Sequence, residues 1–195
     1  MEVIGIWSAI DLQLASMTTL FLKADYAAVI SMLNALTSST GRSAAINAAA
    51  ESSLSKKDLA LFNAVQTKTK ASRDRRNDFS HHVWGYSDGL MDALLLTDPR
   101  YLASYHAERH RIFEDLEKRL REARVTADEM NNVPNIDNSH VYVYRIDDLN
   151  REIRDARLAF RLHEQLNYAL STKSLGLPDR ARDVVCQELF ALVGN

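Results

Sequence analysis

The chain has 195 residues, of which 46% are hydrophobic and 26% charged, with six glycines and three prolines. This composition is typical of one helix-rich globular domain with a full hydrophobic core, and nothing in it suggests disorder. The formal charge of -2 excludes a protein that attracts nucleic acid by its overall charge. Any phosphate binding has to rely on a local group of cations, for which the sequence offers Lys68, Lys70, Arg73, Arg75 and Arg76.

Cysteine usage and the N-terminal segment indicate a cellular compartment. Cys186 is the only cysteine, so an internal disulfide and a thiolate metal cluster are excluded, which fits a reducing environment. The N-terminal segment lacks a cationic start, and Asp11 and Gln13 interrupt its apolar residues. We therefore expect neither a signal peptide nor a membrane span, and a cytoplasmic location.

The first half of the chain is patterned for helices. Apolar residues at helical spacing predict a first amphipathic helix that ends near Lys23. Asp25 is placed to cap a second helix, residues 38–41 interrupt the pattern, and the alanine-rich residues 42–51 predict a third. Ser55, with an aspartate three residues later, resembles a weak capping box. It begins a fourth helix, which carries a basic run to its end.

Residues 73–86, where this helical pattern ends, gather three arginines, an amide, two adjacent histidines, two aromatic residues and a phenol. A histidine exchanges protons near neutral pH, and an arginine fork fits phosphate oxygens, so the combination suits phosphodiester chemistry. Arg73, Asn77 and His81 follow one another by four-residue steps on a helix, so Asn77 can hold a ring nitrogen of His81. Arg76 and His81 would diverge on a straight helix. For both to meet one phosphate, either the helix breaks near Ser80 or a second chain completes the site.

The segment Arg76-Asn77-Asp78-Phe79-Ser80-His81, with Trp84 three residues on, resembles the Arg-Asn-x-x-x-His signature of the HEPN superfamily, in particular its small stand-alone bacterial members. The chain has Ser80 where alanine is usual and His82 where glycine is usual. Some toxins of this superfamily carry a tyrosine two residues after the histidine that a partner nucleotidyltransferase modifies, and that position is Val83 here.

The resemblance implies an α-helical protein that dimerises, with two copies of the motif facing one cleft. Many such proteins are metal-independent ribonucleases, and others bind RNA or nucleotides without catalysis. By resemblance, His81 would transfer protons, Arg76 would neutralise charge on the phosphorus centre, and Asn77 would orient His81. Arg73, Ser80, His82 and Tyr86 are supporting candidates. Because RNA supplies its own nucleophile, no metal or cofactor is expected.

Asp11 lies on the flank of the first apolar stripe, one turn from Trp7. HEPN domains often carry an acidic residue on the first helix, so the resemblance implies that Asp11 pairs with Arg76. A solvated flank residue is the alternative for Asp11. For the motif as a whole, the alternative is an arginine-rich helix end whose cations stabilise the helix dipole.

The second half begins with different patterns. Residues 90–97 and 140–146 are short segments of apolar, β-branched and aromatic residues that could pair as an antiparallel ribbon. Between them, residues 101–130 predict an exposed charged helix, either a solvated arm or a dimer contact. Pro134 marks a polar loop. Asp147 then opens a helix to about Leu170, and Pro178 begins a last one.

Further histidine-containing segments compete with the motif as candidate sites. His106 and His110 lie one helical turn apart, a spacing that can bind zinc, which would suit a metal-dependent hydrolase; a solvated helix face is the simpler interpretation. His163 and Cys186 are expected to pack in the core, and His140 to cap a strand. Neither a glycine-rich phosphate loop nor a Gly-x-Ser-x-Gly elbow is present in the sequence.

Together these observations predict an all-α, HEPN-like up-and-down helical bundle, which can include the small two-stranded ribbon, as one domain over residues 1–195. The predicted function is metal-independent cleavage of RNA at a composite site in a homodimer. The alternative is a non-catalytic RNA- or nucleotide-binding or interaction module, which would suit one half of a toxin–antitoxin or defence system. The expected partners are RNA, a second copy of the chain and an antitoxin-type protein, with no membrane.

Overall fold

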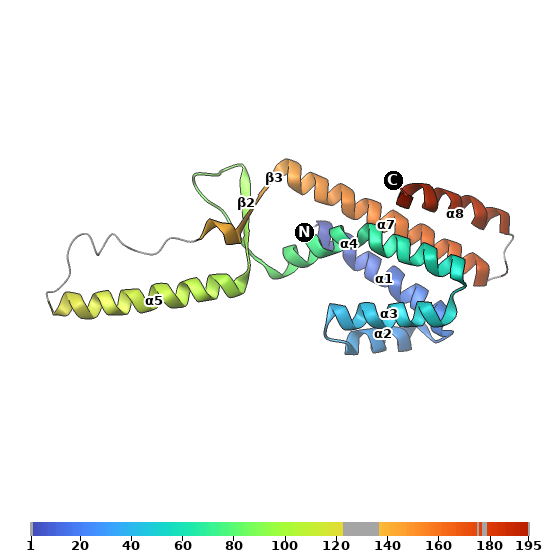
Figure 1. The fold of residues 1–195 in the computed structure, drawn as a ribbon, viewed down its shortest axis with the longest axis horizontal. Helices are drawn as coiled ribbons and strands as arrows, with labels where there is room; N and C mark the ends of the chain where they lie inside the picture. Colours follow the sequence, from blue (N-terminus) through green and yellow to red (C-terminus); the bar gives the residue numbers. More distant parts are fainter. Residues whose placement is uncertain (1, 123–136, 175, 177–178, 195) are drawn as a thin grey trace. The chain divides into compact units, whose positions relative to one another are not determined.

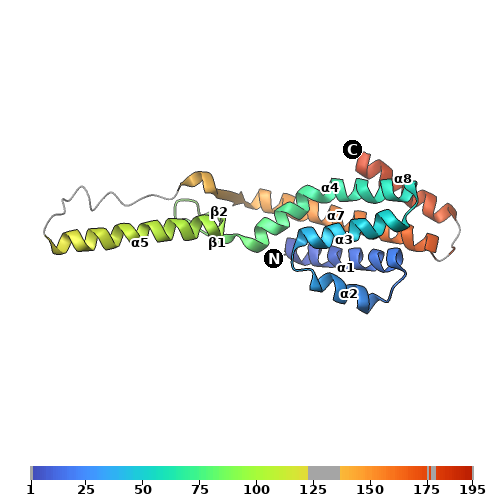
Figure 2. The same cartoon turned by 60° about the horizontal axis from the view of Figure 1, so that its bottom comes forward.

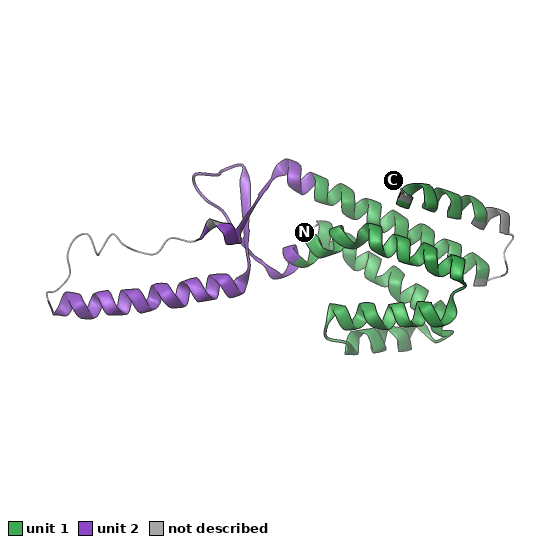
Figure 3. Ribbon diagram, in the orientation of Figure 1, with its two compact units in different colours: residues 1–77, 151–195 green, residues 78–150 purple. Residues whose placement is uncertain are grey.

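A computed structural model describes residues 2–122, 137–174, 176 and 179–194. These residues form two compact units (Figure 3). Unit 1 comprises residues 1–77 and 151–195, and unit 2 comprises residues 78–150. The described residues contain seven α-helices and one three-stranded antiparallel sheet, which confirms a mostly α fold with a small β element. The organisation as one domain stays a prediction.

Unit 1 is built from helices alone within its described residues. They are α1 (Glu2–Leu22), α2 (Tyr26–Ala35), α3 (Ser39–Ser53), α4 (Lys56–His81, up to residue 77), α7 (Ile146–Ser174, from residue 151) and α8 (Asp179–Gly194). Helix α1 packs against both α2 and α3, as Figure 1 and Figure 2 show. Trp7 of α1 also reaches α4 and α7: its Nε1 donates to Ser72 Oγ over 3.2 Å, and its ring meets His163 edge-on.

Four of the helices, α2, α3, α4 and α5 (Pro99–Arg121), begin where a side chain accepts from one of their first backbone N–H groups. The Asp25 carboxylate accepts from two amides of α2, and Ser55 Oγ accepts from the amide of Asp58, as predicted. Each such cap stabilises a helix by about 1 kcal/mol. The predicted interruption at residues 38–41 is wrong in part. Ser38 accepts from the Gly41 amide as the N-cap of α3, so the interruption ends there and helix α3 starts at Ser39.

Helix α1 is long and apolar enough to cross a membrane by length and composition. The same is true of core helices in proteins that never enter a bilayer. Within unit 1, residues along α1 such as Trp7, Ile10 and Met17 are fully or almost fully buried, so this helix serves as a core element. The cytoplasmic location stays a prediction.

Unit 2 contains the sheet. Strand β2 (Ala93–Thr97) lies between β1 (Val83–Gly85) and β3 (Val141–Arg145), and both pairings are antiparallel. The predicted pairing of residues 90–97 with 140–146 is confirmed in the register Leu94↔Tyr144. Strand β1 is an addition that the sequence did not predict. Residues 90–92 precede the strand, because backbone hydrogen bonds from Leu90 and Ala93 close turns there.

One face of the sheet packs against the end of α4 that belongs to unit 2. The ring of Phe79 is 5.4 Å from that of Trp84 and 5.1 Å from that of Tyr144. The indole Nε1 of Trp84 donates to the Phe79 carbonyl over 3.0 Å. Aromatic pairs of this kind contribute beyond their buried area. A small aromatic cluster therefore joins the last turn of α4 to the sheet.

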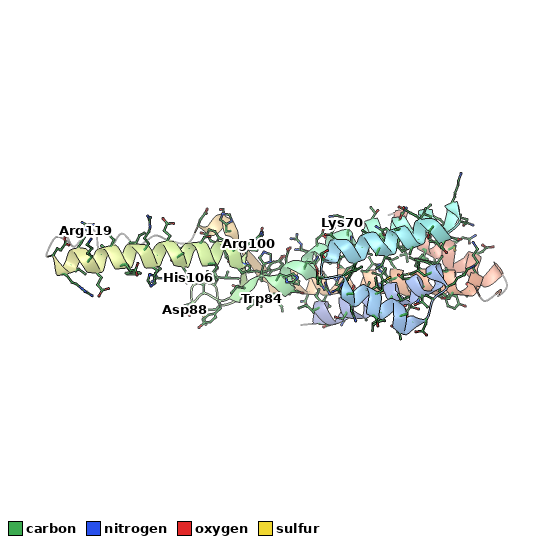
Figure 4. All side chains as sticks on the ribbon, turned by 90° about the horizontal axis from the view of Figure 1, so that it is seen from below. Lys70, Trp84, Asp88, Arg100, His106 and Arg119 are labelled. Carbon is green, nitrogen blue, oxygen red and sulfur yellow. The ribbon has the colours of Figure 1, made fainter. Side chains whose placement is uncertain are left out.

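Helix α5 (Pro99–Arg121) follows β2, with Asp98 as its N-cap. Its side chains stand out along its length in Figure 4, which labels Arg100, His106 and Arg119. Leu116 is the one buried residue of α5, and Arg121 pairs with Glu117 over 2.6 Å, so the prediction of an exposed charged helix is confirmed as far as Arg121. Residues 123–130, Pro134 and Pro178 lie outside the described residues.

Candidate functional site

The motif residues are divided between the two units. Helix α4 carries the motif and ends at His81, so the helix stops close to the break expected near Ser80. Arg76 and Asn77 belong to unit 1, whereas Ser80, His81, His82 and Tyr86 belong to unit 2.

Arg76 is held by two partners in unit 1. Its Nη2 donates to Asp11 Oδ2 over 3.0 Å, and its Nη1 donates to Asn77 Oδ1 over 3.1 Å. The pairing of Asp11 with Arg76 is therefore present, and it links α1 to α4. The arginine side chain is 23% exposed and that of Asp11 is 50% exposed. Because the Asn77 oxygen accepts from Arg76, that atom orients the arginine; the role of Asn77 toward His81 stays a prediction.

The pair lies in a pocket of about 160 Å³ among α1, α2, α3 and α4. Besides Asp11 and Arg76, its polar lining consists of residues from three helices: Asn34, Ser39, Arg42, Ser43, Arg73 and Asn77. Its apolar wall includes Trp7, Leu33 and Ile46, which are buried. The pocket therefore presents three guanidinium groups and one carboxylate to a single small volume.

The pKa of the Asp11 carboxyl is raised above its usual value. Partial burial is the largest cause, and it outweighs the opposing attraction of Arg76, Arg42 and Arg73, named in decreasing order of effect. All three arginines of the pocket thus act on the same carboxylate. Desolvation destabilises the ionised carboxylate more than the three arginines stabilise it.

Arg73 is fixed by a chain of hydrogen bonds that runs into the core of unit 1. Its Nη1 lies 3.2 Å from Gln66 Oε1, and Gln66 Nε2 lies 3.3 Å from Nε2 of His163. His163 Nδ1 lies 2.8 Å from the Ala159 carbonyl. A carbonyl only accepts, so Nδ1 carries the proton and Nε2 accepts from Gln66. The donor and acceptor roles are consistent from Arg73 to Ala159.

His163 is fully buried, as predicted, and desolvation lowers its pKa to about 4. The ring is therefore neutral at pH 7. Gln66, which links Arg73 to His163 by hydrogen bonds, was not predicted from the sequence as a site residue. Its only signal is a polar side chain seven residues before Arg73, on the same side of a regular helix.

The remaining cations of the basic run do not share this pocket. Lys70 pairs with Asp74 over 2.6 Å on the exposed surface of α4, and Arg75 lies 3.6 Å from the buried carboxylate of Glu152. A helix turns by about 100° per residue, so successive cations leave it in different directions. The predicted cation group is therefore divided around α4.

The motif residues of unit 2 lie at the end of α4 and beyond it. His81 is the last residue of the helix, and its side chain is exposed. The ring of His82 is half-buried: its Nδ1 donates to the Asp78 carbonyl over 2.9 Å, and its centroid is 6.1 Å from that of Tyr142. Ser80 is exposed, and Tyr86 is 82% exposed.

The competing histidines are accounted for by local contacts. His106 lies edge-on to Tyr105, and His110 Nδ1 is 3.4 Å from Glu114 on the surface of α5. His140 directly precedes β3 and stacks on Tyr101 at 4.2 Å. Among the described residues, no group of three or more His, Cys, Asp or Glu side chains is placed to hold a metal ion. Cys186 is buried, as expected for packing.

No family model, curated protein or solved structure matches this chain. Its function has to be inferred from the chemistry of the residues themselves.

Proposed function

We propose that the chain is a metal-independent endoribonuclease of the HEPN type, which cleaves RNA by attack of the ribose 2′-hydroxyl on the adjacent phosphate. The observation that carries the proposal is the Asp11–Arg76 ion pair of 3.0 Å, at the arginine that opens the Arg-Asn-x-x-x-His segment. A guanidinium fixed in this way is ready to meet charge that develops on a phosphate, with little reorganisation.

In this mechanism Arg76 stabilises the phosphorane-like charge, and Asp11 and Asn77 orient its guanidinium. His81, exposed at the end of α4, accepts the proton of the 2′-hydroxyl or donates one to the leaving 5′-oxygen. Five residues of a regular helix correspond to a rotation of about 140°, so the spacing of Arg76 and His81 in the sequence would place them on different sides of a straight helix. This divergence favours a composite site in a homodimer, in which two copies of His81 supply acid and base.

The test is incubation of the purified chain with end-labelled RNA in excess EDTA, followed by mapping of the product ends. We expect products with 2′,3′-cyclic phosphates. We expect the rate to fall by at least about a hundredfold in Arg76→Ala and in His81→Ala, because each removes charge stabilisation or proton transfer in the transition state. Lys70→Ala, on the same helix, and His106→Ala, on α5, are matched controls that should retain the wild-type rate. Absence of cleavage of single-stranded and structured RNA by the folded wild type would overturn the proposal.

A second candidate is a non-catalytic binding module, and one observation favours it. Arg76 is largely buried and already bonded to Asp11 and Asn77, an arrangement that can hold an anion without help from a histidine. Such a module would bind RNA or a nucleotide with equal affinity in the wild type and in His81→Ala. Growth on induction separates the two: an unregulated ribonuclease is toxic, and His81→Ala relieves the toxicity, whereas a binding module gives the same growth in both.

A further inference from the structure

We propose that the pocket among α1, α2, α3 and α4 is a binding site for a tetrahedral oxyanion: free phosphate or the terminal phosphate monoester of a larger molecule. The pocket shares Arg76 with the proposed cleavage chemistry and goes beyond it, because it adds Arg42 of α3 and Arg73 of α4. Neither belongs to the Arg-Asn-x-x-x-His segment, and the site does not require His81.

The charge of the pocket is the first reason. Arg42, Arg73 and Arg76 line it together with a single carboxylate, that of Asp11. The lining therefore carries a net positive charge, although the whole chain has a formal charge of -2. Ser39, the first residue of α3, also lines the pocket, so the positive end of that helix dipole lies at the same place.

The second reason is that the protein holds each guanidinium in place. Arg42 Nε donates to the Leu36 carbonyl over 2.8 Å, and Arg73 and Arg76 are bonded to Gln66 and Asp11. Three long side chains from two helices thus have little rotamer freedom left to lose when an anion binds. Preorganisation of this kind lowers the entropic cost of binding.

The third reason is the size and lining of the pocket. The pocket volume of about 160 Å³ is below the range of about 300–1,000 Å³ typical of sites for whole small-molecule ligands. A phosphate group fits this volume better than a complete nucleotide does. An internal phosphodiester brings a nucleoside on each side, so a terminal monoester fits better. Buried Trp7, Leu33 and Ile46 beside the cations reduce solvent screening.

The first arm of the test measures binding of inorganic phosphate to the full chain by calorimetry. We expect Arg42→Gln and Arg73→Gln each to weaken binding by at least about tenfold, since each removes charge-assisted hydrogen bonds. Lys70→Gln removes the same charge outside the pocket, on the exposed surface of α4, and should leave the dissociation constant for phosphate unchanged. Arg42 is exposed, so Arg42→Gln keeps the test decisive even if Arg73→Gln fails to fold.

The second arm compares one oligoribonucleotide with a 5′-phosphate and with a 5′-hydroxyl, both bound to the His81→Ala chain. Tighter binding of the phosphorylated form, lost in a chain that also carries Arg42→Gln, would assign the site to RNA ends. Equal binding of both forms, with phosphate bound in the first arm, would assign it to the free ion. Absence of phosphate binding by the wild type, or equal affinities in Arg42→Gln and Lys70→Gln, would overturn the proposal. Cleavage of RNA is measured separately, so this site and the ribonuclease can each fail alone.

Discussion

The two units satisfy their polar side chains in different ways. In unit 1, buried polar groups reach across the chain: Gln66 bonds to His163, 97 residues away, and Lys173 pairs with the buried Asp58 over 2.5 Å. In unit 2, many of the ion pairs join residues two to four positions apart, such as Glu117 with Arg121. Some large aromatic side chains of unit 2 are exposed, Tyr142 to 52% and Tyr86 to 82%, whereas Phe79 and Tyr144 are buried.

This difference indicates which substitutions should lower the stability of the fold most. A buried polar contact between distant helices couples those helices, because breaking it leaves a desolvated group behind. An exposed pair within one helix contributes little and couples only its own turn. The motif contains residues of both kinds. Arg76 is held by a contact with a distant helix within unit 1, and His81 is an exposed residue at a helix end in unit 2.

The largest expected effect is in the core of unit 1. Phe62 is fully buried and meets Phe21 edge-on at 5.8 Å. Phe62→Ala should lower the free energy of unfolding by about 3–5 kcal/mol, through lost transfer energy and a cavity. Phe113→Ala, at a 44% exposed position of α5, should cost less than about 1 kcal/mol. Urea denaturation of both variants measures the difference, and equal losses would show that the two units do not differ in this way.

The next effect is the pH dependence that His163 imposes. Its pKa is about 4 in the folded chain, lowered by burial, against about 6.5 when unfolded. The unfolded chain therefore binds a proton first as the pH falls, and stability that is complete above pH 6.5 is lost progressively toward pH 4. By pH 5 the loss is about 2 kcal/mol.

His163→Gln supplies the matched variant, because glutamine can donate and accept but does not titrate. We expect the difference in unfolding free energy between wild type and His163→Gln to shrink by about 2 kcal/mol between pH 7 and pH 5. A difference that is constant over this range would mean that His163 titrates normally in the folded chain.

A smaller effect is expected in the aromatic cluster of unit 2. Trp84 is 41% exposed and donates its Nε1 hydrogen to the Phe79 carbonyl. Trp84→Phe keeps a ring against Phe79 and removes the donor, so the loss should be about 1 kcal/mol. Thermal unfolding followed by near-ultraviolet circular dichroism measures it. A loss as large as that of Phe62→Ala would contradict the view that contacts in unit 2 act locally.

Local patterns were sufficient to predict much of the fold. Helical spacing and the capping residues Asp25 and Ser55 placed the first four helices, and alternation placed β2 against β3. Strand β1 was missed because three residues, Val83–Gly85, are too few to show a period of two. The start of α3 was missed because serine is common both in loops and at helix N-caps, and Ser38 is the N-cap of α3.

The site was predictable only in part, for a related reason. Asp11 and Arg76 are 65 residues apart in the sequence, and their pairing was predicted from the resemblance to a family pattern. Arg42 and Gln66 carried no such signal, because their roles depend on how α3 and α4 pack against α1. Periodicity shows which face of a helix is apolar, but it does not show which polar residues of different helices meet.

The smallest effect on stability is expected from Asp11→Asn. This variant also distinguishes the two proposals most clearly. Because the folded chain raises the pKa of this carboxyl, folding favours the protonated form, and the contribution of Asp11 to stability falls as the pH rises through the folded pKa. Asparagine resembles the protonated acid, so stability at pH 7 should change by less than about 1 kcal/mol.

The same variant should move the two activities in opposite directions. The proposed ribonuclease should lose about tenfold in rate, since Arg76 loses the carboxylate that orients it. Phosphate should bind more tightly, because losing the one negative charge that lines the pocket outweighs the weaker orientation of Arg76, which keeps its hydrogen bond to Asn77. If phosphate binds more tightly and the cleavage rate does not change, the result supports the anion site and shows that Asp11 has no role in the catalytic mechanism. Weaker phosphate binding would show that Asp11 holds the pocket together rather than competing with its ligand.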